Sequence, residues 1–474
     1  MTSQTPPAFE TNAADFLGPL QDLLGADQVL TDPDSLTTYG QDWTRAWEPR
    51  PAAIVLPRSV EDVVALVGLA NQWRFPLVPS GGRTGLSGGA VAASGEVVVA
   101  LDRMNRILAF DPVDRLVTCQ AGVITGQLQE FALEQGLYYP VDFASAGSSQ
   151  IGGNVSTNAG GIKVIRYGMT RNWVMGMKVV TGRGELLSLN LGLTKNNTGY
   201  DFRHLFVGAE GTLGLVVEVT VALASAPRDP TVMLLGVPHM EATMEVLKVF
   251  QQGMTLNAFE FFSEKALGHV LRDKQLPRPL QSVSPFYAII EFENDGHNSL
   301  DMAMERFESC LESGWVDDGI LSQDSGQVAE LWRYREDISE TISRFNPYKN
   351  DISVRVSGVP AFLREVETLV NRQYPDFEII WFGHIGDGNV HLNILKPADL
   401  DKATFFSRCG EVSEEVFEIV RRFGGSISAE HGVGLLKKPY LTFSRSREEI
   451  GYMKAIKQVF DPNNIMNPGK VFDL

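Results

Sequence analysis

Two histidines and a short turn signal form the clearest chemical pattern in the sequence. His384 and His391 are seven residues apart, and Asp387-Gly388 lies between them with apolar runs on either side. An Asp-Gly pair in this setting predicts a two-residue β-hairpin turn. With that turn, residue 384 pairs with residue 391, and their Cβ atoms lie about 4.5–5.5 Å apart. The two imidazoles could then bind one metal ion, with Asn393 on the same face of the sheet.

A third metal ligand is available in residues 428–434, which contain Glu430 and His431 side by side. Two imidazoles and one carboxylate leave positions open for water and substrate, and they suit Zn²⁺, with Mn²⁺ or Fe²⁺ also open. We expect Glu430 to bind the metal and His431 to face the substrate, because neighbours in extended backbone point apart. The alternative is a cross-strand histidine pair beside a glutamate, with no metal function.

Glycine-rich stretches indicate a second kind of site. Five glycines fall within residues 81–89, and this run carries no Asp or Glu. Glycine backbone can close its N–H groups around an anion such as a pyrophosphate, although a flexible surface loop would look similar. Residues 147–161 and 197–214 repeat the pattern, which suggests one large polar ligand contacted along its length. None of these stretches matches the dinucleotide fingerprint GxGxxG, so a Rossmann fold is not expected.

The overall composition excludes several classes of protein. The net charge is −17, which argues against binding to nucleic acid or to an anionic membrane. Cys119, Cys310 and Cys409 lie far apart, which predicts neither a disulfide framework nor a thiolate zinc site and fits a reducing compartment. The sequence shows no secretion signal and no apolar run of membrane-spanning length. We therefore expect a cytoplasmic protein.

Hydrophobic periodicity predicts two α+β domains. Residues 1–50 are expected to be a lead-in with one helix at 13–24. The prolines at 227 and 230 mark the domain boundary, and the second domain should place helices on an antiparallel sheet. The expected strands are 53–56, 77–78, 96–101, 115–120, 232–237, 258–262 and 287–292. The expected helices are 59–71, 126–136, 242–251, 299–313 and 328–343.

Four long motifs carry a family resemblance: PSGGRTGLSGG, IGGNVSTNAGG, NTGYDFRHLFVGAEGTLG and DPNNIMNPGK. They resemble the FAD domain of the vanillyl-alcohol oxidase / para-cresol methylhydroxylase superfamily, in its D-2-hydroxy-acid dehydrogenase branch. Within that branch the sequence is most similar to D-2-hydroxyglutarate dehydrogenases, with D-lactate dehydrogenases as relatives. The resemblance implies an FAD-binding domain at 51–226, a substrate and metal domain at 227–424, and a C-terminal helical segment at 425–474 that returns to the flavin.

The resemblance also implies how FAD is held. Some members attach FAD through a histidine of the first glycine loop, but here Arg83-Thr84 stands at that place, which predicts non-covalent FAD. The expected FAD contacts are Pro79, Gly81, Gly82, Arg83, Thr84, Gly85, Ser87, Gly88, Gly147, Ser148, Gly152, Gly153, Asn154, Thr157, Asn158, Gly160, Gly161, Glu210, Gly211 and Asn467.

The substrate site implied by the resemblance is cationic. The family pattern of Arg, Thr or Ser, and Lys falls on Arg335, Ser339 and Lys349, and four-residue spacing puts the first two on one face of a helix. Asn393 should join them in holding carboxylates. His431 stands where the family has its catalytic base, so it should contact the substrate as well.

The activity implied is oxidation of a D-2-hydroxy acid to the 2-oxo acid, by metal-assisted deprotonation of the hydroxyl and hydride transfer to FAD. D-2-hydroxyglutarate is the expected substrate because two cationic groups suit a dicarboxylate, with D-lactate, D-malate or glycolate as alternatives. Electron-transfer flavoprotein or a quinone is the expected acceptor, and a homodimer the expected assembly. A non-redox metal-dependent hydrolase and a non-catalytic flavin sensor are more distant alternatives.

Overall fold

The computed structural model describes residues 12–294, 296 and 298–474, and the chain divides into two compact units. One unit, here called the sheet unit, comprises Gly161–Gly168 and Pro227–Ala429. The other, here called the loop unit, comprises the described residues from 12 to 160, Met169–Ala226 and Glu430–Leu474. The sequence interpretation had assigned residues 161–168 to the FAD domain and had begun the last segment at 425. The start of the expected lead-in, residues 1–11, lies outside the described residues.

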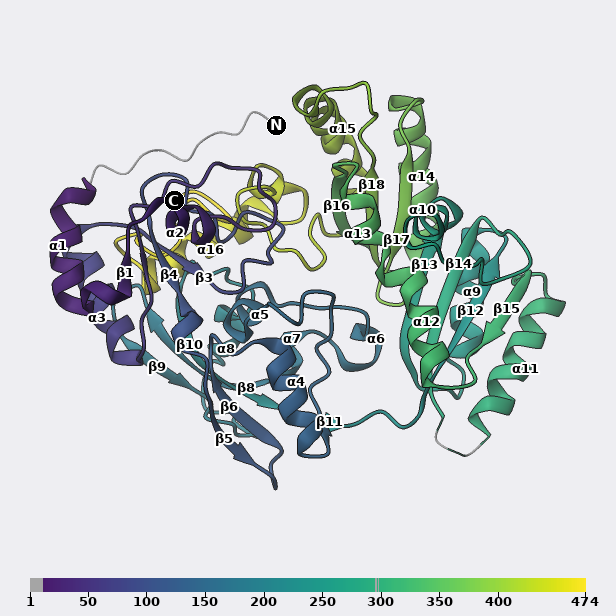
Figure 1. Ribbon diagram of the computed structural model, residues 1–474, viewed down its shortest axis with the longest axis horizontal. Helices are drawn as coiled ribbons and strands as arrows, with labels where there is room; N and C mark the ends of the chain where they lie inside the picture. The colour runs from purple at the N-terminus through teal and green to yellow at the C-terminus, as the bar shows by residue number, and fades with distance from the viewer. Residues whose placement is uncertain (1–11, 295, 297) are drawn as a thin grey trace. The chain divides into compact units, whose positions relative to one another are not determined.

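The loop unit contains a small sheet that ends at the first glycine loop. Its strands follow the order β1 (Val29–Leu30), β2 (Ala53–Val55), β4 (Val97–Ala100) and β3 (Leu77–Ser80). The last three are parallel, and β1 is antiparallel to β2. The helices are α1 (Ala13–Leu24), α2 (Pro33–Tyr39) and α3 (Val60–Trp73), and α1 packs on α3 (Figure 1). Ser59 begins α3 as predicted, since its hydroxyl accepts the Asp62 N–H at 3.1 Å.

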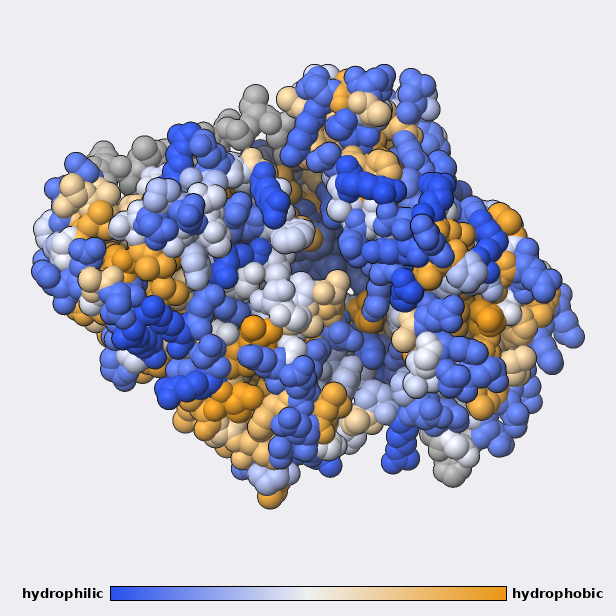
Figure 2. Space-filling view, viewed as in Figure 1, coloured by the Kyte–Doolittle hydropathy of each residue, from blue (hydrophilic) through white to orange (hydrophobic). Residues whose placement is uncertain are grey.

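A second, antiparallel sheet completes the loop unit. Its order is β5 (Ile107–Asp111), β6 (Leu116–Gln120), β10 (Gly214–Ala222), β8 (Val174–Thr181) and β9 (Leu186–Leu189). The remaining elements are β7 (Leu137–Tyr138), β11 (Ala224–Ser225), α4 (Thr125–Glu134), α5 (Ile151–Thr157), α7 (Thr170–Trp173), α8 (Arg203–Phe206) and α16 (Arg447–Phe460). One apolar core joins both sheets to the C-terminal segment and includes Val55, Val219 and Met466. Apolar side chains also gather on the surface over β5 and β6, where Leu108 and Val113 are exposed (Figure 2).

The sheet unit is built on seven antiparallel strands. Their order is β15 (Asp318–Leu321), β12 (Pro230–Val237), β14 (Phe286–Glu293), β13 (Leu256–Ser263), β17 (Ile379–Gly383), β18 (Asn389–Ile394) and β16 (Tyr348–Ser353). The helices are α6 (Val164–Tyr167), α9 (Met240–Phe250), α10 (Glu264–Lys274), α11 (Ser299–Glu312), α12 (Ser325–Glu336), α13 (Ile338–Ser343), α14 (Val359–Gln373) and α15 (Lys402–Arg422). Side chains of α10, α12 and α13 share a core with Phe262 and Phe382, and α14 packs on α15 (Figure 1).

The predicted hairpin exists, but its predicted register is wrong. Phe382, not residue 384, pairs with His391, and Trp381 pairs with Leu392. The connection therefore takes residues 384–388 instead of two turn residues. Its backbone folds back on itself, since the N–H groups of Asp387 and Asn389 both donate to the His384 carbonyl, at 3.1 and 3.2 Å. These local bonds compete successfully with the tighter turn that an Asp-Gly pair favours.

The predicted continuous helix over 328–343 is also wrong, because it is two helices that meet at Asp337. Asp337 has φ −70° and ψ −9°, which is still right-handed helical backbone, and its N–H donates to the Arg333 carbonyl at 3.2 Å. Arg335 lies in α12 and Ser339 in α13.

Gly388 provides a direct test of the hairpin connection. Its φ is +87°, and a Cβ on it would lie 2.1 Å from the Val354 carbonyl oxygen. Gly314 also has a positive φ of +69°, but a Cβ there would meet no atom within 4 Å. We expect Gly314→Ala to lower the free energy of unfolding by about 1–2 kcal/mol, because alanine is strained in left-handed backbone. Gly388→Ala should lower the free energy of unfolding by ~1–3 kcal/mol more than Gly314→Ala does, because its Cβ overlaps the Val354 carbonyl. Chemical unfolding of both variants measures the difference. Equal losses in the two variants would contradict this account.

Candidate active site

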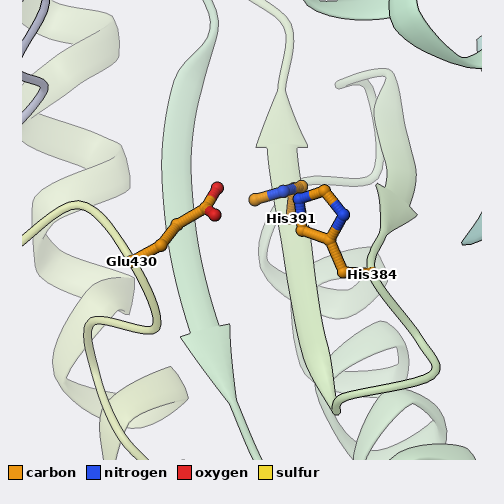
Figure 3. Close-up of side chains that lie close together, drawn as sticks. All are labelled: His384, His391 and Glu430. Carbon is orange, nitrogen blue, oxygen red and sulfur yellow. The ribbon is translucent and has the colours of Figure 1, made fainter. Parts of the chain in front are cut away.

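Two imidazoles and a carboxylate lie close together, as the sequence predicted. One ligand atom from each of His384, His391 and Glu430 lies within 4.8 Å of the other two, and the three side chains point toward one another (Figure 3). The imidazole ring centroids are 5.3 Å apart. His391 belongs to β18, whereas His384 comes from the connection before it. The wrong register thus still gave the right neighbours, because the folded connection turns His384 back toward the strand.

Asp351 fixes the chain just before Glu430. It lies on β16 directly opposite His391, and its Oδ2 accepts the Ala429 N–H at 3.1 Å. Ser353 and Ser426 form an isolated β-bridge in the same region. Glu430 follows Ala429 by one peptide bond, so these contacts limit where its carboxylate can reach. A second set with metal-binding geometry, Asp351, Glu430 and His431, shares this glutamate.

Sequence reasoning missed the partners of the two histidines. His384 Nδ1 lies 2.8 Å from Glu260 Oε1, and His391 Nδ1 lies 3.7 Å from Asp351 Oδ1. Both carboxylates are 1% exposed. A signal was present, because Glu260 is a lone charged residue in the apolar strand LNAFEFFS. Its partner, however, is 124 positions away and could not be read from the sequence.

Of the residues expected to bind substrate, Lys349 and Asn393 lie side by side, whereas Arg335 and Ser339 lie elsewhere. Lys349 and Asn393 are direct cross-strand partners, two residue pairs along from Asp351 and His391 and therefore on the same face of the sheet. Burial lowers the pKa of Lys349, and the amide nitrogen of Asn393 is buried without a hydrogen-bond partner in the described part of the chain. Arg335 is 5% exposed and forms an ion pair with Glu260 at 2.8 Å. Ser339 is half-buried beyond the break at residue 337.

His431 differs from expectation in its direction. Its Nε2 lies 3.7 Å from Glu430 Oε1, so the two neighbouring side chains approach each other instead of pointing apart. The prediction was wrong because the backbone here is bent, not extended, with positive φ at Gly432 and Gly434. The segment 428–434, which carries His431, is called the histidine loop below. A Cβ at Gly434 would lie 2.2 Å from the Ser87 carbonyl oxygen, so this glycine lets the histidine loop pass against the first glycine loop.

The glycine stretches converge in the loop unit. A Cβ at Gly82 would lie 2.1 Å from the Ser148 carbonyl oxygen, and one at Gly211 would lie 2.3 Å from the Pro79 ring. The amide nitrogen of Asn467 donates to the carbonyls of Gly89 and Glu210, at 2.9 and 2.7 Å. Segments far apart in the sequence therefore meet around one region of bare backbone. Side-chain oxygens of Ser80, Gln150 and Asn467 are buried there without hydrogen-bond partners among the described residues, which fits a polar ligand such as FAD.

The second glycine stretch is a short helix for part of its length. Residues 151–157 form α5, which Asn158 ends in the left-handed conformation at φ +51°. The Asn154 amide donates to the Thr125 hydroxyl at 2.6 Å, and Asn158 Oδ1 accepts the Arg171 N–H at 2.9 Å. Both side chains thus have roles within the fold, at positions expected to contact FAD.

Several other expected FAD contacts also have structural partners. The Arg83 guanidinium pairs with Asp102 at 3.2 Å and lies over the Tyr39 ring. The Gly88 N–H donates to Asp42 Oδ2 at 2.7 Å, and the Gly85 carbonyl accepts the Trp43 N–H at 3.0 Å. These bonds hold the backbone of the first glycine loop in shape. They leave its remaining N–H groups as the part that could contact a phosphate.

Glu210, which is expected to contact FAD, binds the backbone of the histidine loop through its side chain. Its two carboxylate oxygens accept the N–H groups of Val433 and Gly434, at 2.7 and 2.8 Å. Gly432 has a positive φ of +82°, and a Cβ there would lie 2.9 Å from the same carboxylate, so both the backbone and the space favour glycine. Burial raises the pKa of Glu210 to about 7, although these two bonds act in the opposite direction. One buried carboxylate thereby positions the segment that follows His431.

Comparison with known proteins identifies the family. The model for the C-terminal domain of FAD-linked oxidases matches residues 226–471, and the FAD-binding domain model matches residues 51–190. The chain belongs to the FAD-linked oxidases. It is an FAD-dependent oxidoreductase, as the glycine motifs predicted.

The similar proteins cover nearly the whole chain. The D-2-hydroxyglutarate dehydrogenase of Stutzerimonas stutzeri is 60% identical over 96% of this chain and 98% of its own length. That of Xanthomonas citri pv. viticola is 53% identical over 96% of both chains. The solved structure of p-cresol methylhydroxylase aligns with TM-score 0.75 at 16% identity, covering 98% of each chain, which confirms the predicted fold class. Across the described residues, no helix has the length and apolar character needed to cross a bilayer.

The Glu210 carboxylate predicts a specific pH dependence. Because its folded pKa of about 7 lies above its ordinary value of 4.5, the unfolded chain loses this proton first as the pH rises. The stabilisation is fully present below pH 4.5 and is lost as the pH rises through 7. Glu210→Gln cannot titrate, so the stability advantage of the wild type over this variant should shrink from pH 5 to pH 8, as measured by thermal unfolding. A constant difference would contradict the assignment.

Proposed function

We propose that the protein oxidises D-2-hydroxyglutarate to 2-oxoglutarate, with non-covalent FAD as electron acceptor and a divalent metal, Zn²⁺ first, at His384, His391 and Glu430. The observation that carries the choice of substrate is the Lys349–Asn393 pair, which lies beside His391 on the sheet. It supplies a cation in addition to Arg335, and a five-carbon dicarboxylate needs two. The named dehydrogenases at 60% and 53% identity support the same substrate.

Each proposed site residue has one role in the proposed reaction. Arg335 and Lys349 bind the two carboxylates of the substrate, and Ser339 and Asn393 add hydrogen bonds. His431 Nε2 takes the hydroxyl proton as the carbonyl forms. FAD, when bound, accepts the two electrons, and the metal, when bound, acidifies the hydroxyl. The two glycine loops with Glu210, Gly211 and Asn467 form the FAD-binding part, in residues 51–226 and 425–474.

The substrate assignment is tested by anaerobic bleaching of the yellow flavin with a panel of 2-hydroxy acids. We expect D-2-hydroxyglutarate to reduce the flavin with the highest kcat/KM, and its L-enantiomer to be inert. A higher kcat/KM for D-lactate, D-malate or glycolate would show that the substrate is a different 2-hydroxy acid. Absence of bleaching with every acid would favour the non-redox hydrolase or the sensor.

Loss of the base should separate FAD binding from catalysis. We expect His431→Ala to retain FAD but to slow flavin reduction by about 10²–10⁴-fold, the usual contribution of a general base. His204→Ala is the control, since this histidine is 50% exposed and pairs with Arg171 and Asp201. Stopped-flow absorbance measures both rates. Reduction at a near-normal rate in the first variant would remove His431 from the base role.

Removal of the metal is the corresponding test of the histidine–glutamate cluster. After exhaustive chelation we expect the protein to remain yellow but to lose reduction by substrate, with recovery on addition of Zn²⁺, Mn²⁺ or Fe²⁺. His391→Ala should lower the metal content measured by elemental analysis. Full activity in a sample shown to be metal-free would end the proposal.

The proposal extends to the attachment of FAD, the electron acceptor, the compartment and the assembly. Without a histidine in the first glycine loop, FAD should be non-covalent, so acid precipitation should leave a colourless pellet. Electron-transfer flavoprotein or a quinone is the proposed acceptor, and the cytoplasm the proposed compartment, where three separate cysteines fit a reducing environment. The exposed apolar residues over β5 and β6 support a homodimer, which light scattering would test (Figure 2).

A further inference from the structure

Burying the charge of Glu260 at its position in the sheet has a high free-energy cost. It lies in the middle of β13, and only 1% of it is exposed. Its strand neighbours are apolar, and it pairs across the sheet with Ile289. An isolated buried carboxylate costs several kcal/mol, so it persists only with strong partners.

The two oxygens of Glu260 hold two different functional groups. Oε1 lies 2.8 Å from His384 Nδ1, and Oε2 lies 2.8 Å from Arg335 Nη2. Arg335 is also fixed from the side, since its guanidinium lies 4.8 Å from the centre of the Phe382 ring. A single carboxylate therefore connects a proposed metal ligand with a proposed substrate contact.

The contact with His384 selects which ring nitrogen can bind a metal. An ionised carboxylate can only accept hydrogen bonds, so the proton of neutral His384 belongs on Nδ1. The lone pair is then on Nε2, which is the nitrogen left to bind the ion. Carboxylate partners of this kind orient histidine ligands and raise their basicity. The corresponding pair of His391 and Asp351 is longer, at 3.7 Å, and Asp351 also accepts from Asn389 and Ala429.

The contact with Arg335 leaves part of the guanidinium available. Arg335 Nε is buried and has no hydrogen-bond partner in the described part of the chain. A buried, unpaired N–H donor is costly, and a substrate carboxylate would satisfy it. The ion pair with Glu260 compensates the buried charge before the substrate arrives. Glu260 Oε2 accepts no hydrogen bond from a described residue, so the plane of the guanidinium is limited by the Phe382 ring on which it lies.

We propose that Glu260 is the positioning residue of the site, which fixes the metal-binding tautomer of His384 and holds the charge of Arg335 in place with one carboxylate. The proposal rests on the proposed function, because it takes His384 as a metal ligand and Arg335 as a substrate contact. Its consequence is that metal binding and substrate binding share a support. A change at Glu260 should weaken both, although Glu260 contacts neither ligand.

The main test is Glu260→Gln, which keeps the size of the side chain. An amide has one acceptor oxygen and no charge, so it cannot serve both partners. We expect Zn²⁺ affinity, measured by competition with a chromophoric chelator, to fall about 10–100-fold. KM for D-2-hydroxyglutarate should rise more than kcat falls, and Glu260→Asp, which keeps the charge, should recover part of both losses.

Glu291→Gln is the matched control. Glu291 is 2% exposed on the neighbouring strand β14, where it accepts from Asn257 and Trp332. The contacts of its carboxylate among the described residues are with Asn257, Trp332 and Lys163, not with the histidines or Arg335, so Zn²⁺ affinity should stay within two-fold of the wild type. Wild-type affinity in folded Glu260→Gln would overturn the proposal, and so would an equal loss in both variants.

A tautomer measurement keeps the test independent of folding in the variants and of the proposed function. Nitrogen-15 NMR of the histidine rings in the metal-free wild-type protein should show His384 with a proton on Nδ1 and none on Nε2. The opposite tautomer would overturn the role of Glu260. If the wild type instead bound no metal and no 2-hydroxy acid bleached it, the proposed function would fail, while the Nδ1 tautomer would still support Glu260 as the partner of His384.

Discussion

The register between β16, β18 and β17 is the constraint on which the candidate site depends. Because side chains alternate between the two faces of a sheet, one register decides at once which residues lie beside His391. The observed register puts Asp351 opposite His391, and Lys349 opposite Asn393. A shift by one residue would replace these polar neighbours with Ile352 and Asn350 and would send the imidazole to the other face. The proposed metal ligand His391, its carboxylate neighbour Asp351 and the proposed substrate cation Lys349 therefore form one geometric unit.

Buried carboxylates do the positioning in both units. Glu260 holds His384 and Arg335, Asp351 holds the chain before Glu430, and Glu210 holds the backbone after His431. Each is buried, and each accepts hydrogen bonds or ion pairs from a segment that carries a candidate functional side chain. In a low-dielectric setting such contacts are strong and directional, so they limit the freedom of residues that lie in loops or beside breaks in helices.

The glycines of this chain serve packing between segments as much as ligand approach. Gly82 lets the first loop touch Ser148, Gly211 lies against Pro79, and Gly434 lies against Ser87. At each position a side chain would overlap backbone or ring atoms. The same feature that indicated a phosphate-wrapping loop in the sequence thus also brings distant stretches together, and only the remaining backbone donors are left for a cofactor.

The sequence by itself determined the family, the fold class, most strands and helices, and the two histidines and glutamate of the cluster. Long motifs and the periodicity of apolar residues are local in the chain, so these features could be predicted. Only the tertiary structure decided the register at His391, the break at Asp337, the approach of His431 to Glu430, and the partners of Glu210 and Glu260. The physical reason is that each depends on competition between local backbone preferences and contacts made across long stretches of chain. Glu260 and His384, 124 residues apart, meet only when β13 and β17 lie side by side.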